Sequence, residues 1–137
     1  MQTFPVLRTA ALAVGLLVAV VLPAHAADGA ALVAPAFGNT VLSIYPDGRS
    51  QKIWMHPDGT WDGKSRRGTP LAGRWSVKSD KVCLKQSKPP VGPFAYCAPF
   101  PAQVKMDVAW ASRDMGGAPI QIKIVKGMVT AYQPTDR

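Results

Sequence analysis

Residues 40–59 read TVLSIYPDGRSQKIWMHPDG, and this stretch decides the fold. Two β-rich runs each end in the same three residues, Pro46-Asp47-Gly48 and Pro57-Asp58-Gly59. Proline fixes φ early in such a turn, and glycine takes the positive φ that the turn requires. The spacing of eleven residues between the two turns is typical of consecutive hairpins and not of a helix. The stretch therefore predicts antiparallel strands joined by tight turns.

Short strands and turns continue over the rest of the chain. The expected strands are Thr40–Tyr45, Ser50–His56, Thr60–Gly63, Ala72–Lys78, Lys81–Gln86, Phe94–Pro99, Gln103–Ala111 and Ile120–Val129. Gln103–Ala111 is ambiguous between a strand and a short helix, and its alternating apolar residues favour a strand. In the last strand Ile120, Ile122 and Ile124 alternate with polar neighbours. About eight such strands predict an all-β fold, a small antiparallel barrel or sandwich.

Composition points the same way. The chain has 13 Pro and 12 Gly, and all of its eight acidic residues are Asp. Proline and glycine favour turns, and glutamate is a preferred residue of exposed helices. Long surface helices are therefore not expected.

The N-terminus has the layout of a secretory signal over residues 1–26. Arg8 precedes an apolar run, Ala11–Leu22, and Ala24-His25-Ala26 offers small residues for cleavage after Ala26. The alternative is a membrane anchor, but the run has twelve residues and a spanning helix needs about 20. We expect cleavage, no membrane span afterwards, and a periplasmic or secreted protein. The remaining chain divides into a flexible lead-in at 27–36, one β domain at 37–132 and a frayed tail at 133–137.

Cys83 and Cys97 are the only cysteines. An exported protein meets an oxidising compartment, and two cysteines allow one pairing, so a disulfide between them is expected. By strand parity Cys83 faces away from Val82 and Leu84. A zinc site is the competing interpretation, but only His56 remains beside the two thiols after cleavage.

The residues available for catalysis are few. His56 is the only histidine left after cleavage, both thiols are expected to be oxidised, and glutamate is absent. A Ser-His-Asp triad is recognised by geometry, not by residue types. Glycoside hydrolysis would need a carboxylate pair such as Asp58 and Asp62, but both lie in or beside a turn, where Asp is normally structural. Residues 58–63 faintly resemble a calcium loop, but they lack oxygen ligands at alternate positions and the bidentate Glu. We expect a non-enzymatic protein without cofactor or metal; a hydrolase using Asp and His is the less favoured alternative.

A basic loop and two tryptophans are the candidate ligand contacts. Lys64, Arg66 and Arg67 crowd one loop, and Trp54 and Trp61 lie close by in sequence. Arginine and aromatic side chains together suit phosphate, carboxylate or sugar-ring ligands. The alternative is an ordinary solvated surface. Trp61 lies near a turn, so we expect it to be the most exposed of the tryptophans.

Trp75 has a different expected role. It follows Gly73 in the fourth strand, and we expect it to fill the core with its indole N–H bonded to a backbone carbonyl.

The segment from Phe37 to Pro99 resembles small exported single-disulfide β domains of alphaproteobacteria. The residues that carry this resemblance are Phe37-Gly38-Asn39-Thr40, Tyr45-Pro46-Asp47-Gly48-Arg49, Asp58-Gly59-Thr60, Gly73-Arg74-Trp75, Cys83-Leu84 and Tyr96-Cys97. The resemblance implies a β fold and export, and it supplies no active residues.

Gly73-Arg74-Trp75 followed by Cys83 is also similar, more weakly, to bacterial metalloprotease inhibitors with an eight-stranded barrel and one disulfide, and Gly-x-Trp resembles a lipocalin motif. Those inhibitors act through an N-terminal segment, a part that Asp28–Pro35 would play here. These likenesses concern the fold and say little about function.

Together these features predict an exported, monomeric binding module whose ligand the sequence does not identify. After cleavage 15 Lys and Arg stand against 8 Asp, a formal charge of +7. We expect the partner to be either an envelope protein, which this module would bind as an inhibitor does, or an anionic envelope polymer. Nucleic acid is disfavoured because the signal directs the protein away from it. The alternative is an envelope stress or structural protein without a ligand.

Overall fold

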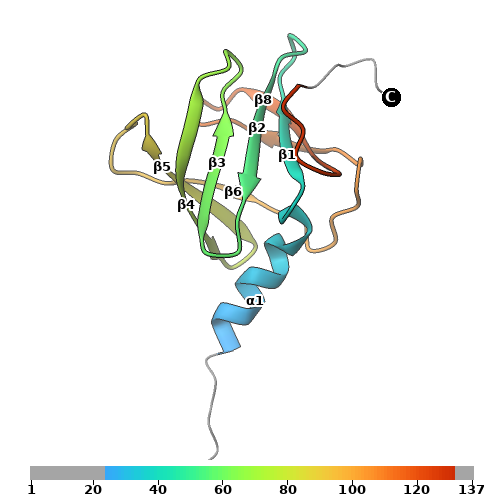
Figure 1. Cartoon of the computed structure of the whole chain (residues 1–137). Helices are drawn as coiled ribbons and strands as arrows, with labels where there is room; N and C mark the ends of the chain where they lie inside the picture. Colours follow the sequence, from blue (N-terminus) through green and yellow to red (C-terminus); the bar gives the residue numbers. More distant parts are fainter. Residues whose placement is uncertain (1–23, 132–137) are drawn as a thin grey trace, which may run out of the picture.

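Eight antiparallel strands form one curled sheet in the computed structural model, which describes residues 24–131. The strands are β1 (Thr40–Ile44), β2 (Ser50–Met55), β3 (Thr60–Lys64), β4 (Pro70–Lys78), β5 (Lys81–Lys88), β6 (Tyr96–Pro99), β7 (Trp110–Arg113) and β8 (Pro119–Val125). Their order is β6-β5-β4-β3-β2-β1-β8-β7. The sheet curls into a nearly closed barrel (Figure 1), which confirms the predicted all-β fold and decides between barrel and sandwich. Most of the predicted signal, residues 1–23, and the predicted tail, 133–137, lie outside the described residues.

The Pro-Asp-Gly turns close the first two hairpins, as predicted. Gly48 and Gly59 have φ of +82° and +88°, values that favour glycine. In each turn the aspartate accepts a hydrogen bond from the backbone N–H two residues later, at 3.0 Å for Asp47 and 2.9 Å for Asp58. These local bonds fix the turn and hence the register of β1 with β2 and of β2 with β3.

Side chains that alternate along the strands fill the barrel. Ile120, Ile122 and Ile124 of β8 are at most 9% exposed, as their alternation predicted. Trp75 packs against this core, and its indole N–H donates to the backbone oxygen of His56 at 2.8 Å, as expected. The strand order places the β1–β2, β3–β4, β5–β6 and β7–β8 connections together at one end of the barrel.

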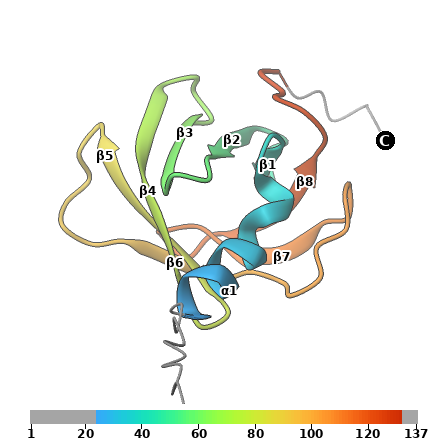
Figure 2. The ribbon, with the colours of Figure 1, turned by 60° about the horizontal axis from the view of Figure 1, so that its bottom comes forward.

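The N-terminal segment is packed on the barrel, contrary to the predicted flexible lead-in at 27–36. It forms α1 (Ala24–Val33) and a short 3-10 helix, η1 (Ala34–Ala36), at the end of the barrel opposite the β1–β2 hairpin (Figures 1 and 2). Val33 and Ala36 are 0% exposed and belong to the core. The barrel end leaves apolar side chains uncovered, and burying this segment against them offsets the entropy of ordering it.

No helix within residues 24–131 has both the length and the apolar character needed to span a membrane.

A polar cluster on the outer face holds the chain that follows β8. The Thr40 hydroxyl donates to the Gly127 carbonyl at 2.7 Å and accepts from the Val129 backbone N–H at 2.8 Å and from Trp54 Nε1 at 3.0 Å. Thr40 is fully buried, and Leu42 beside it on the outer face is also 0% exposed. The last described residues therefore cover the outer face of β1 and β2.

The connection between β6 and β7 differs from the prediction of a strand over Gln103–Ala111. The strand begins only at Trp110, and Asp107 has φ of +62°, which interrupts an extended backbone. Met106 and Val108 are 41% and 54% exposed. Their alternation with Val104 does not mark a buried face, because only Val104 packs against the core.

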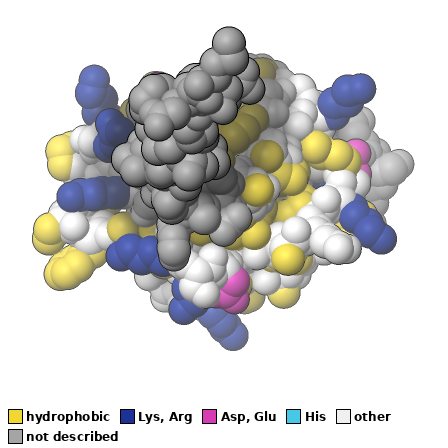
Figure 3. Space-filling model, turned by 90° about the horizontal axis from the view of Figure 1, so that it is seen from below, with side chains coloured by type: hydrophobic (Ala, Val, Ile, Leu, Met, Phe, Trp, Pro, Cys, Tyr) yellow, Lys and Arg dark blue, Asp and Glu magenta, His cyan; other side chains and the backbone are white. Residues whose placement is uncertain are grey.

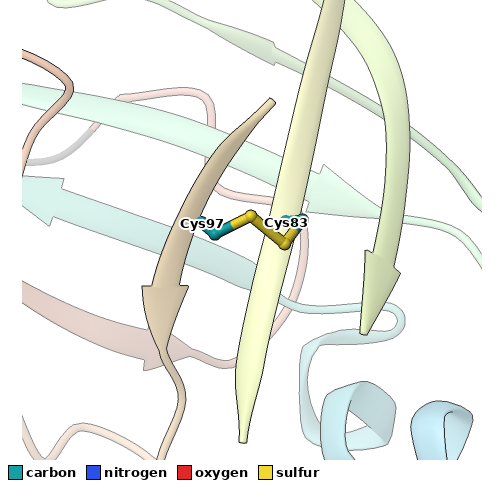
Figure 4. Close-up of a disulfide and its surroundings, with 2 residues drawn as sticks. All are labelled: Cys83 and Cys97. Carbon is teal, nitrogen blue, oxygen red and sulfur yellow. A yellow bond between two sulfur atoms is a disulfide. The ribbon is translucent and has the colours of Figure 1, made fainter. Parts of the chain in front are cut away.

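The predicted disulfide joins neighbouring strands. Cys83 of β5 lies directly opposite Cys97 of β6, and their sulfurs are bonded at 2.05 Å (Figure 4). Cys83 faces the outer side of the barrel, while Val82 and Leu84 face the interior, as parity predicted. A structural disulfide of this kind is typical of proteins outside the cytoplasm.

Candidate ligand-binding mouth and cavity

The barrel interior contains a cavity of about 190 Å³ that opens at the end opposite α1. Its deep wall is mostly apolar, because inward residues of every strand except β4 line the cavity. The buried residues that line the cavity are Val41, Ile53, Met55, Trp61, Val82, Phe100, Ile120 and Ile122, together with the polar Ser43. Apolar pockets with a few polar groups at their opening are typical small-ligand sites.

We call the open end of the barrel the mouth and define it by the four connections that surround it, residues 45–49, 64–70, 88–95 and 113–119. Tyr45, Phe94 and Asp114 come from three of these connections and also line the cavity. The two edge strands approach one another there, and the Tyr96 hydroxyl of β6 donates to the Arg113 carbonyl oxygen of β7. This side-chain bond spans the only break in the barrel wall within the described residues.

Arg66 of the basic loop is stacked on the mouth. Its guanidinium carbon lies 3.8 Å from the centre of the Tyr45 ring, a cation–π contact that joins the β3–β4 turn to the end of β1. Burial raises the pKa of Tyr45 above its usual value of 10.0, and the Asp114 carboxylate raises it further by charge and hydrogen bonding, while Arg66 lowers it. The mouth thus combines a cation, a phenol and a carboxylate.

We expect the Tyr45 phenol to ionise at a higher pH than an unperturbed tyrosine, because its pKa is raised. A raised pKa in the folded protein means that the neutral phenol contributes stability below about pH 10, and that this stability is lost as pH rises through the folded value. Absorbance titration of phenolate should show a late component that Tyr45→Phe removes and that Asp114→Asn shifts to lower pH. A late component unchanged by Tyr45→Phe would contradict the assignment.

An exposed apolar rim flanks the cavity opening. Val91 and Phe94 of the β5–β6 loop are 46% and 83% exposed, and Met115 of the β7–β8 turn is 65% exposed. All three also line the cavity. Large apolar side chains exposed beside an apolar pocket mark an interaction site more strongly than the same residues scattered singly.

The positive charge of the barrel gathers at the mouth. In the described chain the mouth carries six cationic residues, Arg49, Lys64, Arg66, Arg67, Lys88 and Arg113, and two acidic residues, Asp47 and Asp114. Outside α1, the connections at the opposite end, residues 55–60, 78–81, 99–110 and 125–131, carry four lysines, Lys78, Lys81, Lys105 and Lys126, and three aspartates, Asp58, Asp80 and Asp107. The guanidinium of Arg74 in β4 also reaches this end, beside Gly59. Seen from that end, Lys and Arg side chains are spaced around the periphery (Figure 3). The mouth therefore has the larger positive excess, four charges (six minus two) against two (five minus three) at the opposite end.

The predicted contact residues fall into two groups. Lys64, Arg66 and Arg67 are exposed at the mouth, where they remain candidate contacts. The expectation that Trp61 is exposed is wrong: it is 3% exposed, and its indole N–H donates to the Arg74 carbonyl at 3.1 Å. Trp61 faces inward because its register partners, Met55 and Gly73, do so.

Trp54 is also buried. It is 7% exposed on the outer face, where the chain after β8 covers it and Thr40 accepts its indole N–H. Neither tryptophan can therefore offer an exposed ring to a ligand, although Trp61 forms part of the cavity wall.

Sequence reasoning missed the residues that shape the opening. Tyr45, Phe94 and the adjacent pair Asp114 and Met115 come from three connections far apart in the chain, and only the curling of the sheet places them around one cavity. Trp110 was also missed: it lines the cavity, and its indole N–H is buried without a hydrogen-bond partner among the described residues. No sequence pattern marks such a group, because burial depends on the fold.

His56 and Asp62 form a pair away from the mouth. His56 Nε2 lies 2.5 Å from Asp62 Oδ1, and both side chains are nearly half exposed. Asp58, the other acid proposed from sequence for hydrolysis or calcium, accepts hydrogen bonds from Thr60 within its own turn. Within residues 24–131 no three His, Cys, Asp or Glu side chains form a group that could hold a metal ion.

The N-terminal segment does not have the freedom that the inhibitor likeness requires. Val33 lies within the segment expected to enter a protease cleft, and it is fully buried in the core. A cleft-filling role would require this contact to break.

No family model matches the chain, and neither the curated proteins nor the solved structures contain a match. We therefore infer the function from the side chains of the mouth and the cavity.

Proposed function

We propose that this protein is a non-enzymatic binding module, exported to the periplasm or beyond, that engages an anionic component of the cell envelope through the mouth. The observation that carries this proposal is that six cationic residues and only two acidic ones surround the opening of the cavity. The disulfide between Cys83 and Cys97 supports a location outside the cytoplasm.

The arrangement of these charges suits a polyanion. Arg66 and Arg67 lie at the tip of the β3–β4 turn, exposed and on a rigid hairpin that fixes their backbone. Guanidinium groups bind phosphate and carboxylate oxygens through paired hydrogen bonds. Clustered charge of one sign also steers an oppositely charged partner toward the surface before contact. Phosphates of lipopolysaccharide and carboxylates of peptidoglycan are envelope groups of this kind.

The experiment measures binding of lipopolysaccharide and of peptidoglycan fragments to the exported, oxidised protein at 50 and 500 mM salt, values of the order at which screening of exposed charges changes strongly. The double variant Arg66→Glu/Arg67→Glu should weaken binding about 30-fold or more at low salt, since each cation near an anionic surface contributes about 1 kcal/mol.

The matched control reverses two lysines at the opposite end, Lys105→Glu/Lys126→Glu, and so makes the same change in net charge. It should retain most of the affinity. Equal losses in the two double variants would mean that net charge and not the mouth determines binding. Binding that does not respond to salt would contradict the electrostatic role altogether.

A protein partner is a second candidate, favoured by the apolar rim. Phe94 is 83% exposed and Met115 is 65% exposed, and such side chains act as anchors in protein interfaces. In that case an envelope protein would stay bound at high salt, and Phe94→Ser would release it while Arg66→Glu/Arg67→Glu would have the smaller effect.

A further inference from the structure

We propose that the cavity holds the apolar part of a small anionic amphiphile, a carboxylate of roughly eight carbons, whose charged group stays at the mouth beside Arg66. This inference rests on the proposed function and deepens it, because it names a ligand class for the same end of the barrel. It adds a second requirement, that the ligand enter the interior as well as contact the surface.

The size of the cavity sets the length of the apolar part. An apolar cavity of about 150 Å³ is enough to hold benzene, which has six carbons. The interior here measures about 190 Å³, so it holds a ring or a chain segment of roughly six to eight carbons on the same scale. A full-length lipid acyl chain would leave most of its methylenes outside.

The distribution of polar groups sets the orientation. Val41, Ile53 and Ile122 of the deep wall are at most 9% exposed and carry no polar side-chain atom. The buried polar residue Ser43 also lines the cavity, two residues closer to the mouth than Val41 in β1. Gln51 and Gln86 line the cavity nearer the mouth, at the start of β2 and toward the end of β5. A carboxylate at the deep end would exchange its hydration for a single free buried donor of the described chain, the Trp110 indole N–H. One hydrogen bond does not replace the hydration of a charge, so the charged group belongs at the opening.

The charge at the opening selects an anion. Arg66 stands over Tyr45 at the edge of the cavity, and Lys64 and Arg67 lie on the same turn. The acid that lines the opening, Asp114, already accepts hydrogen bonds from the backbone N–H groups of Gly116 and Ala118 at 2.9 and 2.8 Å. An incoming carboxylate therefore meets more cationic than acidic groups.

The first test titrates straight-chain carboxylates of four to twelve carbons into the exported protein and follows tryptophan fluorescence, since Trp61 and Trp110 line the cavity. Affinity should rise about fourfold per methylene up to about eight carbons and then level off. Octanol should bind more weakly than octanoate, and Arg66→Gln should remove this difference. Lys105→Gln, at the opposite end, should preserve it.

The second test fills the cavity. Ala98 of β6 lines the cavity, whereas Ala111 of β7 faces outward and is exposed. Ala98→Leu adds three carbons to the wall, so the length at which affinity levels off should fall by about three carbons. Ala111→Leu makes the same chemical change on the outer face and should leave the series unchanged. Near-ultraviolet circular dichroism checks that both variants are folded. If Ala98→Leu does not fold, the dependence of wild-type affinity on carboxylate length still shows whether the cavity holds the ligand.

Each outcome separates this inference from the proposed function. Affinity that is independent of chain length, together with salt-sensitive polymer binding, would overturn the cavity ligand and leave the mouth as a polyanion site. Length-dependent octanoate binding without any polymer binding would retain the cavity ligand and overturn the proposed envelope polymer. Binding to phosphatidylglycerol vesicles but to no free carboxylate would overturn the cavity ligand in favour of a membrane surface.

Discussion

Gly73→Ala is expected to destabilise the barrel by about 3 kcal/mol or more, at the upper end of the range for overpacked sites. A Cβ at position 73 would lie 2.1 Å from the Lys85 backbone oxygen and 2.8 Å from Trp61 Nε1. Neither neighbour can withdraw at low cost, because the first is backbone of the paired strand and the second is a buried indole that donates to Arg74. Urea denaturation of the purified variant measures the loss.

Gly116→Ala is the matched control for Gly73→Ala. A Cβ at position 116 would meet nothing closer than the Asp114 side chain at 3.5 Å, an ordinary contact. We expect this variant to stay within about 0.5 kcal/mol of the wild type, as surface substitutions generally do. Comparable losses in the two variants would show that the close approach at Gly73 is not what the structure describes.

Removing the disulfide is expected to cost about 3 kcal/mol, because the bridge closes a loop of about 15 residues and so restricts the unfolded chain. The two cysteines are separated by 14 positions in sequence. For a domain of this size the loss corresponds to a fall in Tm of roughly 10–20 °C. Thermal unfolding of Cys83→Ala/Cys97→Ala beside the oxidised wild type measures the difference.

A reducing agent provides the control for the disulfide prediction. It should lower the Tm of the wild type toward that of the double variant and leave the variant itself unchanged. Retention of the full Tm by the double variant would mean that the pairing of β5 with β6 does not depend on the bridge. The antiparallel register of these strands, with Cys83 opposite Cys97, would then be maintained by backbone bonds and by the packing of Val82 and Leu84.

Much of the local structure could be predicted because its causes are local. The two Pro-Asp-Gly turns fix their own geometry through glycine φ and aspartate hydrogen bonds, so their positions follow from residues a few places apart. The alternation of Ile120, Ile122 and Ile124 identifies a buried face for the same reason. Gln103–Ala111 shows the limit, because alternation without burial does not make a strand.

The candidate site was predicted only in part. The clustering of Lys64, Arg66 and Arg67 could be read from sequence because a short loop keeps them together. The burial of Trp61 could not, since it depends on the inward-facing register with Met55 and Gly73. The contact between Arg66 and Tyr45 joins two hairpins and likewise required their positions in space.

The sequence by itself determined the all-β class, the hairpin turns and the pairing of the two cysteines, because each depends on neighbouring residues or on a choice with one answer. Only the tertiary structure decided that the sheet curls into a nearly closed barrel, that residues 29–36 pack across one end, and that the cavity opens at the other end, where six cationic residues stand against two acidic ones. The physical reason is that closure, burial and a shared opening are set by contacts between distant strands, which alternation and turn chemistry do not specify.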